Sequence, residues 1–500
     1  MNIPEYVKQI INNLEEAGFE AFIVGGCVRD LLMKREPEDW DITTNAKPNE
    51  ILDVFPFGKY ENRFGTVIVP VKYLRKQYKD NKELVEITTY RSEQGYSDRR
   101  HPDKVIFEKY LEKDLSRRDF TVNALAMKNK RSKVSIKEDL KKYSFTLDDY
   151  LIVDLFGGYK DIEKKIIRAV GEPTDRFRED ALRMMRAIRF SCQLDFSIEP
   201  KTERGIKKMA GSIKFIANER IRDELIKILK SDRAYDGIKL LHKTGLLKYI
   251  LPEIERGISV SQGRHHIYTV YKHNLLSLKY CPSKDWRVRL AALLHDVAKP
   301  QTKRIVKGQI TFYNHEVVGA KIAEKIAKRL HFSKKDTQKI VTLVRYHMFY
   351  YNVGEVTESS VRRLIKKVGE ENLKDLIDLR VADRLGSGVP KAKPYKLRHL
   401  EYMIKKVKND PISVKMLKIN GNDIMNILKI KPGPKIGAIL DVLLSEVIED
   451  PSLNTKKYLE KRCQELNKID INKLRKKAKN KIEEKIEKED KKLKKEFHVK

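Results

Sequence analysis

Residues 21–44 read AFIVGGCVRDLLMKREPEDWDITT, and this stretch decides how the chain begins to fold. Its first four residues are apolar, which predicts a short buried strand, and Gly25 and Gly26 end that strand in a turn. Arg29 to Met33 predict a helix after the turn, and Asp39 to Thr44 predict a second strand. A strand, a glycine turn, a helix and a second strand are therefore expected in close succession.

Two acidic residues lie two positions apart on the second predicted strand. Alternate side chains of a strand share a face, so we expect the carboxylates of Asp39 and Asp41 on the same side. Mg²⁺ prefers a few carboxylate oxygens with water and phosphate, and two such ions can activate a hydroxyl and neutralise a leaving pyrophosphate. The glycine pair would let backbone N–H groups approach a triphosphate. Such a pair of acids is more often a solvated edge strand, but the nearby glycine turn favours a metal site.

The composition describes a large and strongly cationic chain. Its 500 residues correspond to three domains at roughly 150 residues each, and Lys+Arg 105 against Asp+Glu 71 gives a net charge of +34. This charge favours a polyanionic partner without deciding between nucleic acid and an anionic membrane. The four cysteines are far apart in sequence, which favours a reducing cytosol. No run of about 18 apolar residues occurs, so we expect a cytoplasmic protein without a membrane span.

Hydrophobic periodicity divides the chain into two kinds of structure. Residues 3–17 predict a helix, and residues 65–73 and 83–90 predict a hairpin, so the start of the chain is expected to be α+β. From about Phe156 the apolar spacing becomes helical. Residues 467–500 predict a solvated helix rich in Lys and Glu. We expect four regions with bounds near 1–150, 151–260, 261–390 and 391–500.

The window at 25–41 resembles the catalytic motif of the DNA polymerase beta-like nucleotidyltransferases. It is most similar to the class II tRNA nucleotidyltransferases, the CCA-adding enzymes, and their bacterial poly(A) polymerase relatives. SRRDFTVNALA at 116–126 resembles the second motif of that family, and RED followed by ALRMMRAIRF at 178–190 resembles its base-selecting motif. VEITTYR at 85–91 supplies Glu86 as a candidate third carboxylate.

The resemblance implies a catalytic role and a set of nucleotide contacts. Asp39 and Asp41 would be the catalytic metal ligands. The implied nucleotide-binding residues are Gly25, Gly26, Arg29, Arg91, Arg117, Arg118, Asp119, Asn123, Asp180, Arg183 and Arg186. Residues 92–107 are expected to be a mobile loop, which in the CCA-adding enzymes assists the switch from C to A addition.

The base-selecting motif also has a physical interpretation of its own. Asp180 and Arg183 are three residues apart, so on one helix they would share a face and offer an acceptor beside a donor. Cytosine and adenine both present an amino group beside a ring-nitrogen acceptor. Uracil and guanine would leave buried polar groups unpaired, at a cost of about 1–3 kcal/mol per group. The alternative is a solvated helix face with i,i+3 and i,i+4 ion pairs.

Histidines are concentrated in the middle of the chain. Those between 265 and 347 are His265, His266, His273, His295, His315, His331 and His347. ALLHDVAKP at 292–300 contains an adjacent His–Asp pair. This spacing resembles the HD metal-dependent phosphohydrolases, and the resemblance implies one divalent ion on His273, His295, Asp296 and Asp383.

The same resemblance implies that His315 and His347 lie near a second ion or the substrate. Imidazole with carboxylate suits Mn²⁺, Ni²⁺, Fe or Mg²⁺, and the identity stays open. The implied activity is hydrolysis of a 2′,3′-cyclic phosphate or a phosphomonoester at a damaged RNA end. Asn274 stands where that superfamily usually has a hydroxyl residue, which bears on the activity more than on the metal. The alternative is that the histidines serve packing or RNA contact.

Together these patterns predict an α+β chain. A polymerase beta-like nucleotidyltransferase head (1–150) would precede a mostly α-helical neck and body (151–260), an HD domain (261–390) and a C-terminal helical region (391–500). Residues 419–444 resemble the C-terminal RNA-binding domain of the same enzymes, although an ordinary Pro/Gly turn explains these residues equally well.

We expect addition of CMP, CMP and AMP from CTP and ATP to the 3′ end of tRNA, with two Mg²⁺ ions and no membrane. The alternatives are a poly(A) polymerase, an RNA-end phosphohydrolase with a degenerate transferase, and a non-catalytic RNA-binding protein. The oligomeric state is left open.

Overall fold

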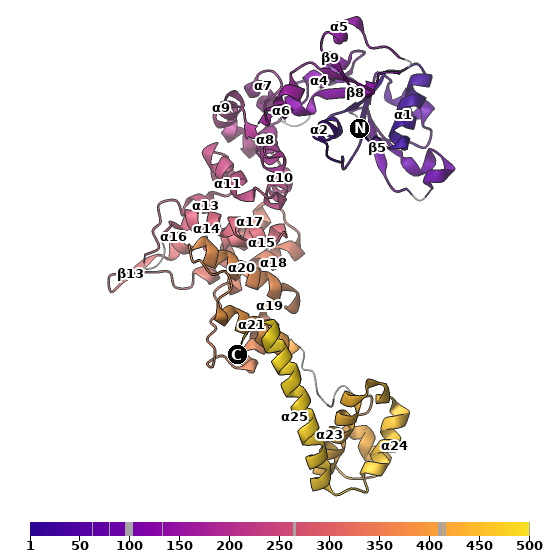
Figure 1. The fold of residues 1–500 in the computed structure, drawn as a ribbon. Helices are drawn as coiled ribbons and strands as arrows, with labels where there is room; N and C mark the ends of the chain where they lie inside the picture. Colours follow the sequence, from indigo (N-terminus) through magenta and orange to yellow (C-terminus); the bar gives the residue numbers. More distant parts are fainter. Residues whose placement is uncertain are drawn as a thin grey trace. The chain divides into compact units, whose positions relative to one another are not determined.

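The computed structural model describes residues 1–499 except 63, 80, 96–103, 133, 264–266, 409–413, 415 and 416. The described residues divide into two compact units (Figure 1). The first comprises residues 1–345 and 382–388, and the second comprises residues 346–381 and 389–500. Across the described residues, no helix is both long and apolar enough to cross a membrane.

The first unit opens with a mixed sheet. Within the described residues the sheet has eight strands in the order β3-β4-β5-β2-β1-β8-β10-β9. Strands β2 and β5 are parallel, and the other neighbouring pairs are antiparallel. The strands are β1 (Ala21–Val24), β2 (Asp41–Thr44), β3 (Lys59–Asn62), β4 (Thr66–Pro70), β5 (Leu84–Thr89), β8 (Leu125–Asn129), β9 (Ser144–Leu147) and β10 (Tyr150–Asp154).

Alternation along β1 explains how the sheet is buried on both faces. Helix α1 (Glu5–Glu16) has a strongly amphipathic sequence and buries Val7, Ile10 and Leu14. Phe22 and Val24 of β1 belong instead to a cluster that includes Tyr90 and Leu115. The two sets of apolar side chains therefore enclose the middle of the sheet, where the predicted catalytic strand β2 lies beside β1.

Most elements predicted for the first 90 residues are confirmed. The helix at 3–17 is α1, the strand at 21–24 is β1, and the predicted hairpin is the pairing of β4 with β5, with Val67 opposite Ile87. The helix after the glycine turn, α2 (Gly26–Leu32), begins earlier than predicted.

Two predictions in this region were wrong. The stretch 92–107 was expected to be a loop, but its ends are strands β6 (Arg91–Gln94) and β7 (Lys104–Phe107), which pair antiparallel. Most of the intervening segment, at 96–103, lies outside the described residues. The second predicted strand begins at Asp41, so Asp39 is not part of it. Pro37 cannot donate to a strand ladder, residues 38 and 39 form a bend, and pairing with β1 starts only at Ile42.

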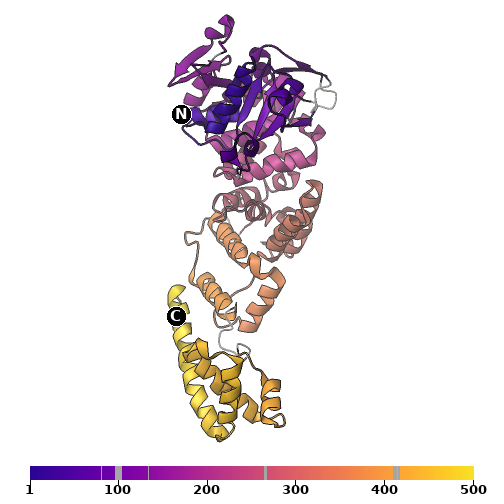
Figure 2. The same ribbon diagram turned by 90° about the vertical axis from the view of Figure 1, so that its right-hand side faces the viewer.

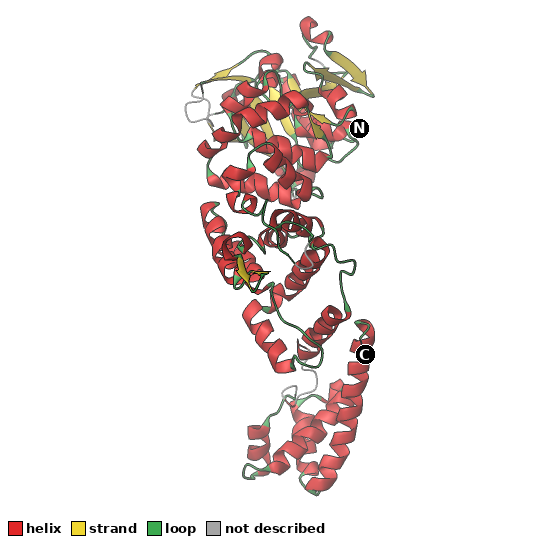
Figure 3. Ribbon diagram, turned by 90° about the vertical axis from the view of Figure 1, so that its left-hand side faces the viewer, coloured by secondary structure: helices red, strands yellow, loops and turns green. Residues whose placement is uncertain are grey.

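The rest of the first unit is mainly helical, as the periodicity predicts (Figure 3). Its elements are α4 (Leu111–Ser116), η3 (Thr121–Asn123), α5 (Glu138–Lys141), α6 (Gly158–Glu163), β11 (Ile166–Ile167), α7 (Pro173–Glu179), α8 (Arg183–Leu194), β12 (Ser197–Ile198), α9 (Pro200–Met209), η4 (Ala210–Phe215), α10 (Asn218–Lys230), α11 (Ala234–Lys243), α12 (Leu247–Ile250), α13 (Pro252–Glu255), α14 (Val270–Lys279), α15 (Trp286–Leu294), α16 (Lys299–Thr302), β13 (Arg304–Val306), β14 (Gln309–Thr311), α17 (His315–Arg329) and α18 (Lys334–Tyr346). Short 3-10 turns η1 (Val71–Tyr73) and η2 (Lys76–Tyr78) and helix α3 (Pro48–Val54) complete the head.

The regular elements of the second unit are all helices, as far as its residues are described (Figure 2). Its elements are α19 (Glu358–Val368), η5 (Glu370–Asn372), the start of α20 (Leu373–Gly386), α21 (Tyr395–Lys408), α22 (Gly421–Leu428), α23 (Pro434–Glu449), η7 (Pro451–Leu453), α24 (Lys456–Leu466) and α25 (Ile471–Glu496). Pro434 is the first residue of α23, where its missing N–H costs nothing. Helix α25 confirms the predicted Lys/Glu helix, and Leu474 of that helix joins a core that includes Ile439, Leu443 and Leu459.

All four cysteines are buried, and none of them forms a disulfide bond in the described part of the chain. Burial raises the pKa of the thiols of Cys27 and Cys192 to about 12. The same cause raises the pKa of Cys463 to about 11. These thiols are therefore protonated at neutral pH.

Candidate functional site

The glycine turn between β1 and α2 keeps a cation beside an acid. Gly25 has φ of +87°, in the region that favours glycine. A Cβ at this position would lie 2.9 Å from Nη1 of Arg118 and 3.6 Å from Oδ2 of Asp41. Any other residue at position 25 would therefore displace Arg118 from the start of β2. Gly26, the first residue of α2, is next to the guanidinium of Arg29, which a Cβ would meet at 3.7 Å.

Three carboxylates interact beside this turn. Asp41 lies opposite Glu86 in the parallel pairing of β2 with β5, and Asp39 is exposed just before β2. The pKa of Asp41 is raised to about 6, chiefly by burial and also by the charges of Asp39 and Glu86, while Arg118 acts to lower it. The local charge at Asp41 is therefore incompletely compensated, which favours a cation beside this carboxylate.

The carboxylates of the head do not form a tight cluster. Within the described ranges, the groups of three candidate metal ligands with donor atoms within 4.8 Å of one another all lie in the histidine-rich region. Asp39, Asp41 and Glu86 are therefore close enough to interact electrostatically but too far apart to share one ion without a small movement.

The arginines of the second predicted motif are held by a buried acid. Asp114 of α4 binds Arg117 at 2.7 Å and Arg118 at 3.3 Å. Burial raises the pKa of Asp114, but the two guanidinium groups outweigh it and hold the pKa below the usual value. Asp114 was not predicted from the sequence, although it lies near the end of α4, three and four residues before these arginines, which directly follow the helix.

Asp119 and Asn123 connect the head to helix α8. One carboxylate oxygen of Asp119 accepts from Nε of Arg186 at 2.7 Å, and the other accepts from Nδ2 of Asn123 at 3.3 Å. Oδ1 of Asn123 accepts from Nη1 of Arg29 at 2.7 Å. Four residues predicted to bind nucleotide, Arg29, Asp119, Asn123 and Arg186, therefore form one continuous network.

Arg91 is the remaining predicted phosphate contact, and it lies on β6. Its Nε donates to Glu93 at 2.9 Å, and Nη1 donates to the carbonyl oxygen of Phe64. Glu93 also binds Arg117 at 3.2 Å, so Arg91 and Arg117 share one acid. This contact links strand β6 to the second motif.

The prediction that Asp180 and Arg183, the base-selecting pair, lie on one helix was wrong. Asp180 has φ of −140° and ψ of 107° and ends α7, whereas Arg183 is the first residue of α8, so no single helix carries both. The side chain of Asp180 accepts from the backbone N–H of Leu182 at 3.0 Å, a local bond that competes with helix continuation. The backbone N–H of Arg183 still bonds the carbonyl oxygen of Asp180 at 3.0 Å, so the two residues remain neighbours in a turn.

Both members of this pair have protein partners. Asp180 binds Arg220 of α10 at 2.8 Å, and Arg183 binds Glu179 at 2.5 Å. The i,i+4 pair of Arg183 with Glu179 is the kind expected of the alternative interpretation, but the partner of Asp180 comes from a distant helix. Arg220 and the buried pair of Arg189 with Glu224, at 3.0 Å, were not predicted. Their partners are more than 30 residues away, and the periodicity of one helix cannot identify such contacts.

Four of the residues predicted to bind a second metal converge at the centre of the helical region. Nε2 of His273 lies 2.9 Å from Nε2 of His295, 3.2 Å from Oδ2 of Asp296 and 3.3 Å from Oδ1 of Asp383. Nε2 of His295 lies 3.3 Å from Asp296 and 3.8 Å from Asp383. His273, His295 and Asp296 are buried, and Asp383 comes from α20, about 90 residues further along the chain.

The histidine rings are oriented by backbone carbonyl oxygens. Nδ1 of His295 bonds the carbonyl oxygen of Ala292 at 2.8 Å, and Nδ1 of His315 bonds that of Phe312 at 2.7 Å. The Nε2 atoms therefore point to Asp296, which His315 meets at 3.3 Å. Fixing one ring nitrogen in this way is typical of metal-binding histidines, and the donor set of imidazoles and carboxylates fits a divalent ion.

The charges of the cluster are coupled. Burial lowers the pKa of His273, but Asp296 and Asp383 outweigh it and raise the pKa to about 9. Lys299 binds Asp296 at 2.6 Å and donates to Gln262 at 2.6 Å. Lys299 was not predicted as a site residue, although it follows Asp296 by three residues.

The other histidines of the sequence cluster have different locations. His265 and His266 lie outside the described residues. His331 is half exposed and faces Glu219 at 3.8 Å. His347 belongs to the second unit.

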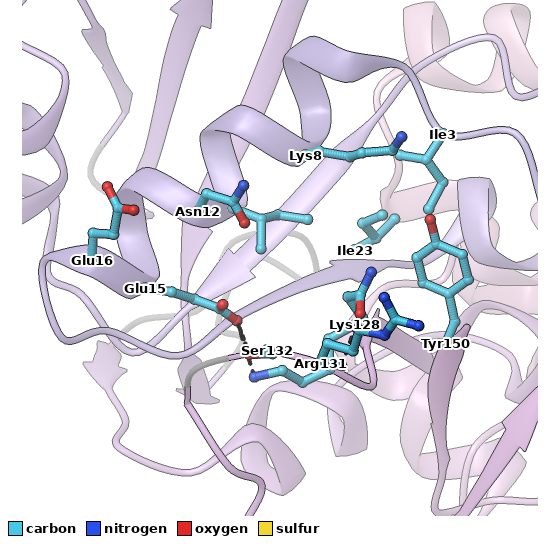
Figure 4. Close-up of a pocket in the computed structure, with 12 residues that line it drawn as sticks. Ile3, Lys8, Asn12, Glu15, Glu16, Ile23, Lys128, Arg131, Ser132 and Tyr150 are labelled. Atoms are coloured by element: carbon cyan, nitrogen blue, oxygen red, sulfur yellow. Dashed lines mark hydrogen bonds and ion pairs between the residues drawn. The ribbon is translucent and has the colours of Figure 1, made fainter.

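A cavity of about 290 Å³ lies elsewhere in the head, and Figure 4 shows the residues that line it. It is bounded by α1, β8 and β10, and the buried pair of Glu15 with Lys128, at 3.1 Å, lies in its wall. None of the residues predicted to bind metal or nucleotide lines this cavity. We assign it to packing between α1 and the sheet.

Three family models match consecutive parts of the chain. Residues 21–168 match the poly A polymerase head domain, residues 195–258 match the probable RNA and SrmB-binding site of polymerase A, and residues 265–387 match the HD domain. Residues 21–168 therefore resemble a poly A polymerase head domain, and residues 265–387 resemble an HD domain. The first match contains the glycine turn and the acids of β2, and the third contains the histidine cluster.

Similar proteins support this assignment. A CCA-adding enzyme of Limosilactobacillus reuteri is 42% identical over 245 residues, which are 49% of this chain and 54% of that protein. A CCA-adding enzyme of Lactobacillus helveticus is 48% identical over 220 residues, 44% of this chain and 48% of that protein. The chain therefore spans about half the length of the curated relatives it matches.

One solved structure resembles nearly the whole chain. The CCA-adding enzyme of Bacillus stearothermophilus in complex with CTP has a TM-score of 0.58 and 25% sequence identity, covering 93% of this chain and 98% of that one. The α+β architecture, with a sheet-containing head and a helical remainder, is therefore that of CCA-adding enzymes. Both the head-domain and the HD families are metal-dependent.

Proposed function

We propose that this protein adds CMP, CMP and AMP from CTP and ATP to the 3′ end of tRNA. The observation that carries the proposal is the meeting of Asp41 with Glu86 across β2 and β5, beside Arg118 at the glycine turn. The relatives named CCA-adding enzymes, one of them solved with CTP, support this choice over the other activities of the family.

Asp39 and Asp41 are the proposed ligands of two Mg²⁺ ions. Bound there, Mg²⁺ would activate the terminal hydroxyl of the RNA and neutralise the departing pyrophosphate. Arg118 lies within reach of the same turn and would bind the triphosphate, with Arg117 and Arg91 beside it. Catalysis would then rest mainly on positioning and charge neutralisation.

The network of Arg29, Asp119, Asn123 and Arg186 is the proposed ribose and phosphate support. Because its members come from α2, from η3 and from α8, a nucleotide bound there would contact both the head and the helical region. Base choice is assigned to Asp180 and Arg183. Their hydrogen-bonding groups are already paired with Arg220 and Glu179, so an incoming cytosine or adenine would have to exchange with those partners.

The proposal extends to the organisation of the chain. The head is assigned to 1–150, the neck and body to 151–260, the HD domain to 261–390 and the C-terminal RNA-binding region to 391–500. Residues 433–435 at the start of α23 are part of the proposed RNA contact. Four buried cysteines outside any disulfide bond of the described residues agree with a cytosolic location.

Product length on a tRNA lacking its 3′ end tests the proposal. With Mg²⁺ present, we expect growth by three nucleotides only when CTP and ATP are both supplied. Unlimited growth with ATP alone would identify a poly(A) polymerase instead. No growth under any combination would refute nucleotidyl transfer and shift the assignment to the HD domain.

A second activity is favoured by the convergence of His273, His295, Asp296 and Asp383. We propose that this cluster binds a divalent metal and hydrolyses a phosphoester at an RNA end, such as a 2′,3′-cyclic phosphate. When bound, the metal would activate water, while Lys299 would hold the carboxylate of Asp296 in place. Hydrolysis of 2′,3′-cyclic AMP after loading with Mn²⁺, Ni²⁺, Fe²⁺ or Mg²⁺ is the test, and no turnover with any of these ions would refute it.

A further inference from the structure

A hairpin rises from the chain between two residues of the metal cluster. Strands β13 and β14 pair antiparallel, with Ile305 opposite Ile310, and Figure 1 shows β13 projecting beyond α16. The segment 297–314 separates Asp296 from His315 and contains four basic residues and no Asp or Glu. These basic residues are Lys299, Lys303, Arg304 and Lys307.

Both ends of the hairpin are anchored at the cluster. On the first side, Lys299 contacts Asp296. On the second side, the carbonyl oxygen of Phe312 orients His315, and Nζ of Lys299 lies 5.4 Å from the centroid of the Phe312 ring. The hairpin therefore begins and ends beside the metal cluster. A chain molecule bound along the hairpin would extend toward that cluster.

The outer surface of the segment is apolar and aromatic as well as cationic. Tyr313 is 71% exposed and Ile305 is 73% exposed. Two Cα–Cα steps separate Tyr313 from His315, so the Cα atoms of these residues are at most about 7.6 Å apart. An exposed aromatic ring next to a phosphoester-hydrolysing cluster can stack on a nucleobase, while Lys303, Arg304 and Lys307 can contact a phosphate backbone.

We propose that the β13–β14 hairpin and Tyr313 bind single-stranded RNA and lead its 3′ end to the metal cluster. This inference rests on the proposed hydrolytic function of the cluster, and it names the substrate class as an RNA strand in preference to a free mononucleotide. Charge complementarity selects the partner, because a segment with cations and no acids attracts a polyanion and would repel another copy of itself.

The test compares two substrates that carry the same phosphoester. We expect Tyr313→Ala, and separately the triple variant K303Q/R304Q/K307Q, to lower kcat/KM on a ten-nucleotide RNA ending in a 2′,3′-cyclic phosphate by about 5-fold or more. The kcat/KM on 2′,3′-cyclic AMP should stay within 2-fold. Raising the salt concentration should weaken the RNA preference of the wild-type protein. The slope of log(kcat/KM) for the RNA against log[salt] should be smaller by about 2 in the triple variant, or about 0.7 per lost charge.

Matched variants control for general effects. Tyr280→Ala removes another exposed tyrosine, and K321Q/K325Q/K328Q removes three exposed charges from α17. Both should leave the two substrates unchanged. Tyr313→Phe should retain the RNA preference, because stacking needs the ring and not the hydroxyl. Equal losses on both substrates, or an unchanged preference in Tyr313→Ala, would overturn the proposal.

A crosslinking readout separates this inference from the proposed hydrolysis. Single-stranded RNA carrying 4-thiouridine near its 3′ end should crosslink to residues 303–313, and less so in the triple variant, whether or not the cluster is active. If the wild-type protein hydrolyses neither substrate but crosslinks there, the hydrolytic function fails and the RNA contact stands. Absence of that crosslink overturns the hairpin proposal. If the protein forms a dimer and Ile305→Lys disperses it, the crosslink decides the role of the hairpin. A retained crosslink would identify a contact between copies in addition to the RNA contact. A lost crosslink would overturn the proposal and assign the hairpin to the contact between copies instead.

Discussion

The head and the HD domain hold their acidic residues in different ways. In the head, Asp39 is exposed before β2, and Asp41 meets Glu86 only across a strand pair. In the HD domain, His273, His295 and Asp296 are buried with their polar atoms about 3 Å apart. The packing of helices brings the donor atoms of the second cluster together, whereas the acids of the head lie on neighbouring strands or just before them and are farther apart. A substitution that abolishes the activity of one site should therefore leave the activity of the other unchanged.

Among the substitutions that compare the two sites, removing the charge of Asp41 is expected to have the largest effect on activity. Asp41→Asn should lower nucleotide addition at least about 1000-fold, because the metal loses its most central ligand, equivalent to about 4 kcal/mol of the barrier. Primer extension with CTP and ATP measures the loss. Hydrolysis of 2′,3′-cyclic AMP serves as the control and should be unchanged. Addition that survives this substitution would refute the assignment of the metal site.

The converse change is His295→Gln in the HD domain. It should lower phosphoester hydrolysis at least about 100-fold and reduce the bound metal measured by elemental analysis, because a buried donor is lost. Addition to tRNA should stay within 2-fold. If both activities disappear together, the histidine cluster supports folding and the independence of the sites is wrong.

Substitutions in the base-selecting turn should change nucleotide preference by a smaller factor. Asp180→Ala with Arg183→Ala removes the acceptor and the donor that would distinguish cytosine and adenine from uracil. We expect the preference for CTP over UTP in single-nucleotide addition to fall by about 10- to 100-fold, in line with about 1–3 kcal/mol per unpaired polar group. An unchanged preference would show that other residues read the base.

The smallest expected effect tests how firmly the HD scaffold is held. Asp285 caps α15, the helix that ends at His295, and it binds Arg287 at 2.6 Å and Lys339 at 3.0 Å. Burial acts to raise the pKa of Asp285, but the bonds from Arg287 and Lys339 outweigh it and hold the pKa well below the usual value. A depressed folded-state pKa contributes stability above the unfolded-state value of about 3.9, and this stability is lost as the pH falls below it.

Asp285→Asn should therefore lower the free energy of unfolding by about 1–2 kcal/mol at pH 7, and by progressively less below about pH 4. Chemical denaturation of both proteins at several pH values measures the difference. A difference that does not shrink at low pH would mean that the charge of Asp285 is not what stabilises the helix. Asp232→Asn, whose acid is exposed and bound to Lys284, is the matched control.

The sequence predicted many of the local elements, because these follow from short spacings. The strand at 21–24, the hairpin of β4 with β5 and the spacing of His295 and Asp296 depend on neighbouring residues only. It failed where tertiary contacts override local pattern. Asp180 was expected within a helix, but its side chain bonds the backbone N–H of Leu182 and its partner Arg220 comes from another helix.

Other parts of the site had no local signal. Glu224 pairs with Arg189 across 35 residues, and the sequence offers many other acids that could do so. By contrast, Asp114 and Lys299 lie three or four residues from their partners, so helical spacing could have identified both.

The burial of the four cysteines has a practical consequence for spectroscopy. Maleimides and similar reagents attack the thiolate; burial shields all four thiols, and it keeps those of Cys27, Cys192 and Cys463 protonated at neutral pH. A new cysteine on the exposed tip of the β13–β14 hairpin would therefore take up a fluorophore or spin label selectively, with the native residues left in place. Such a reporter would follow the arrival of RNA at the hairpin in real time, in a protein otherwise unchanged.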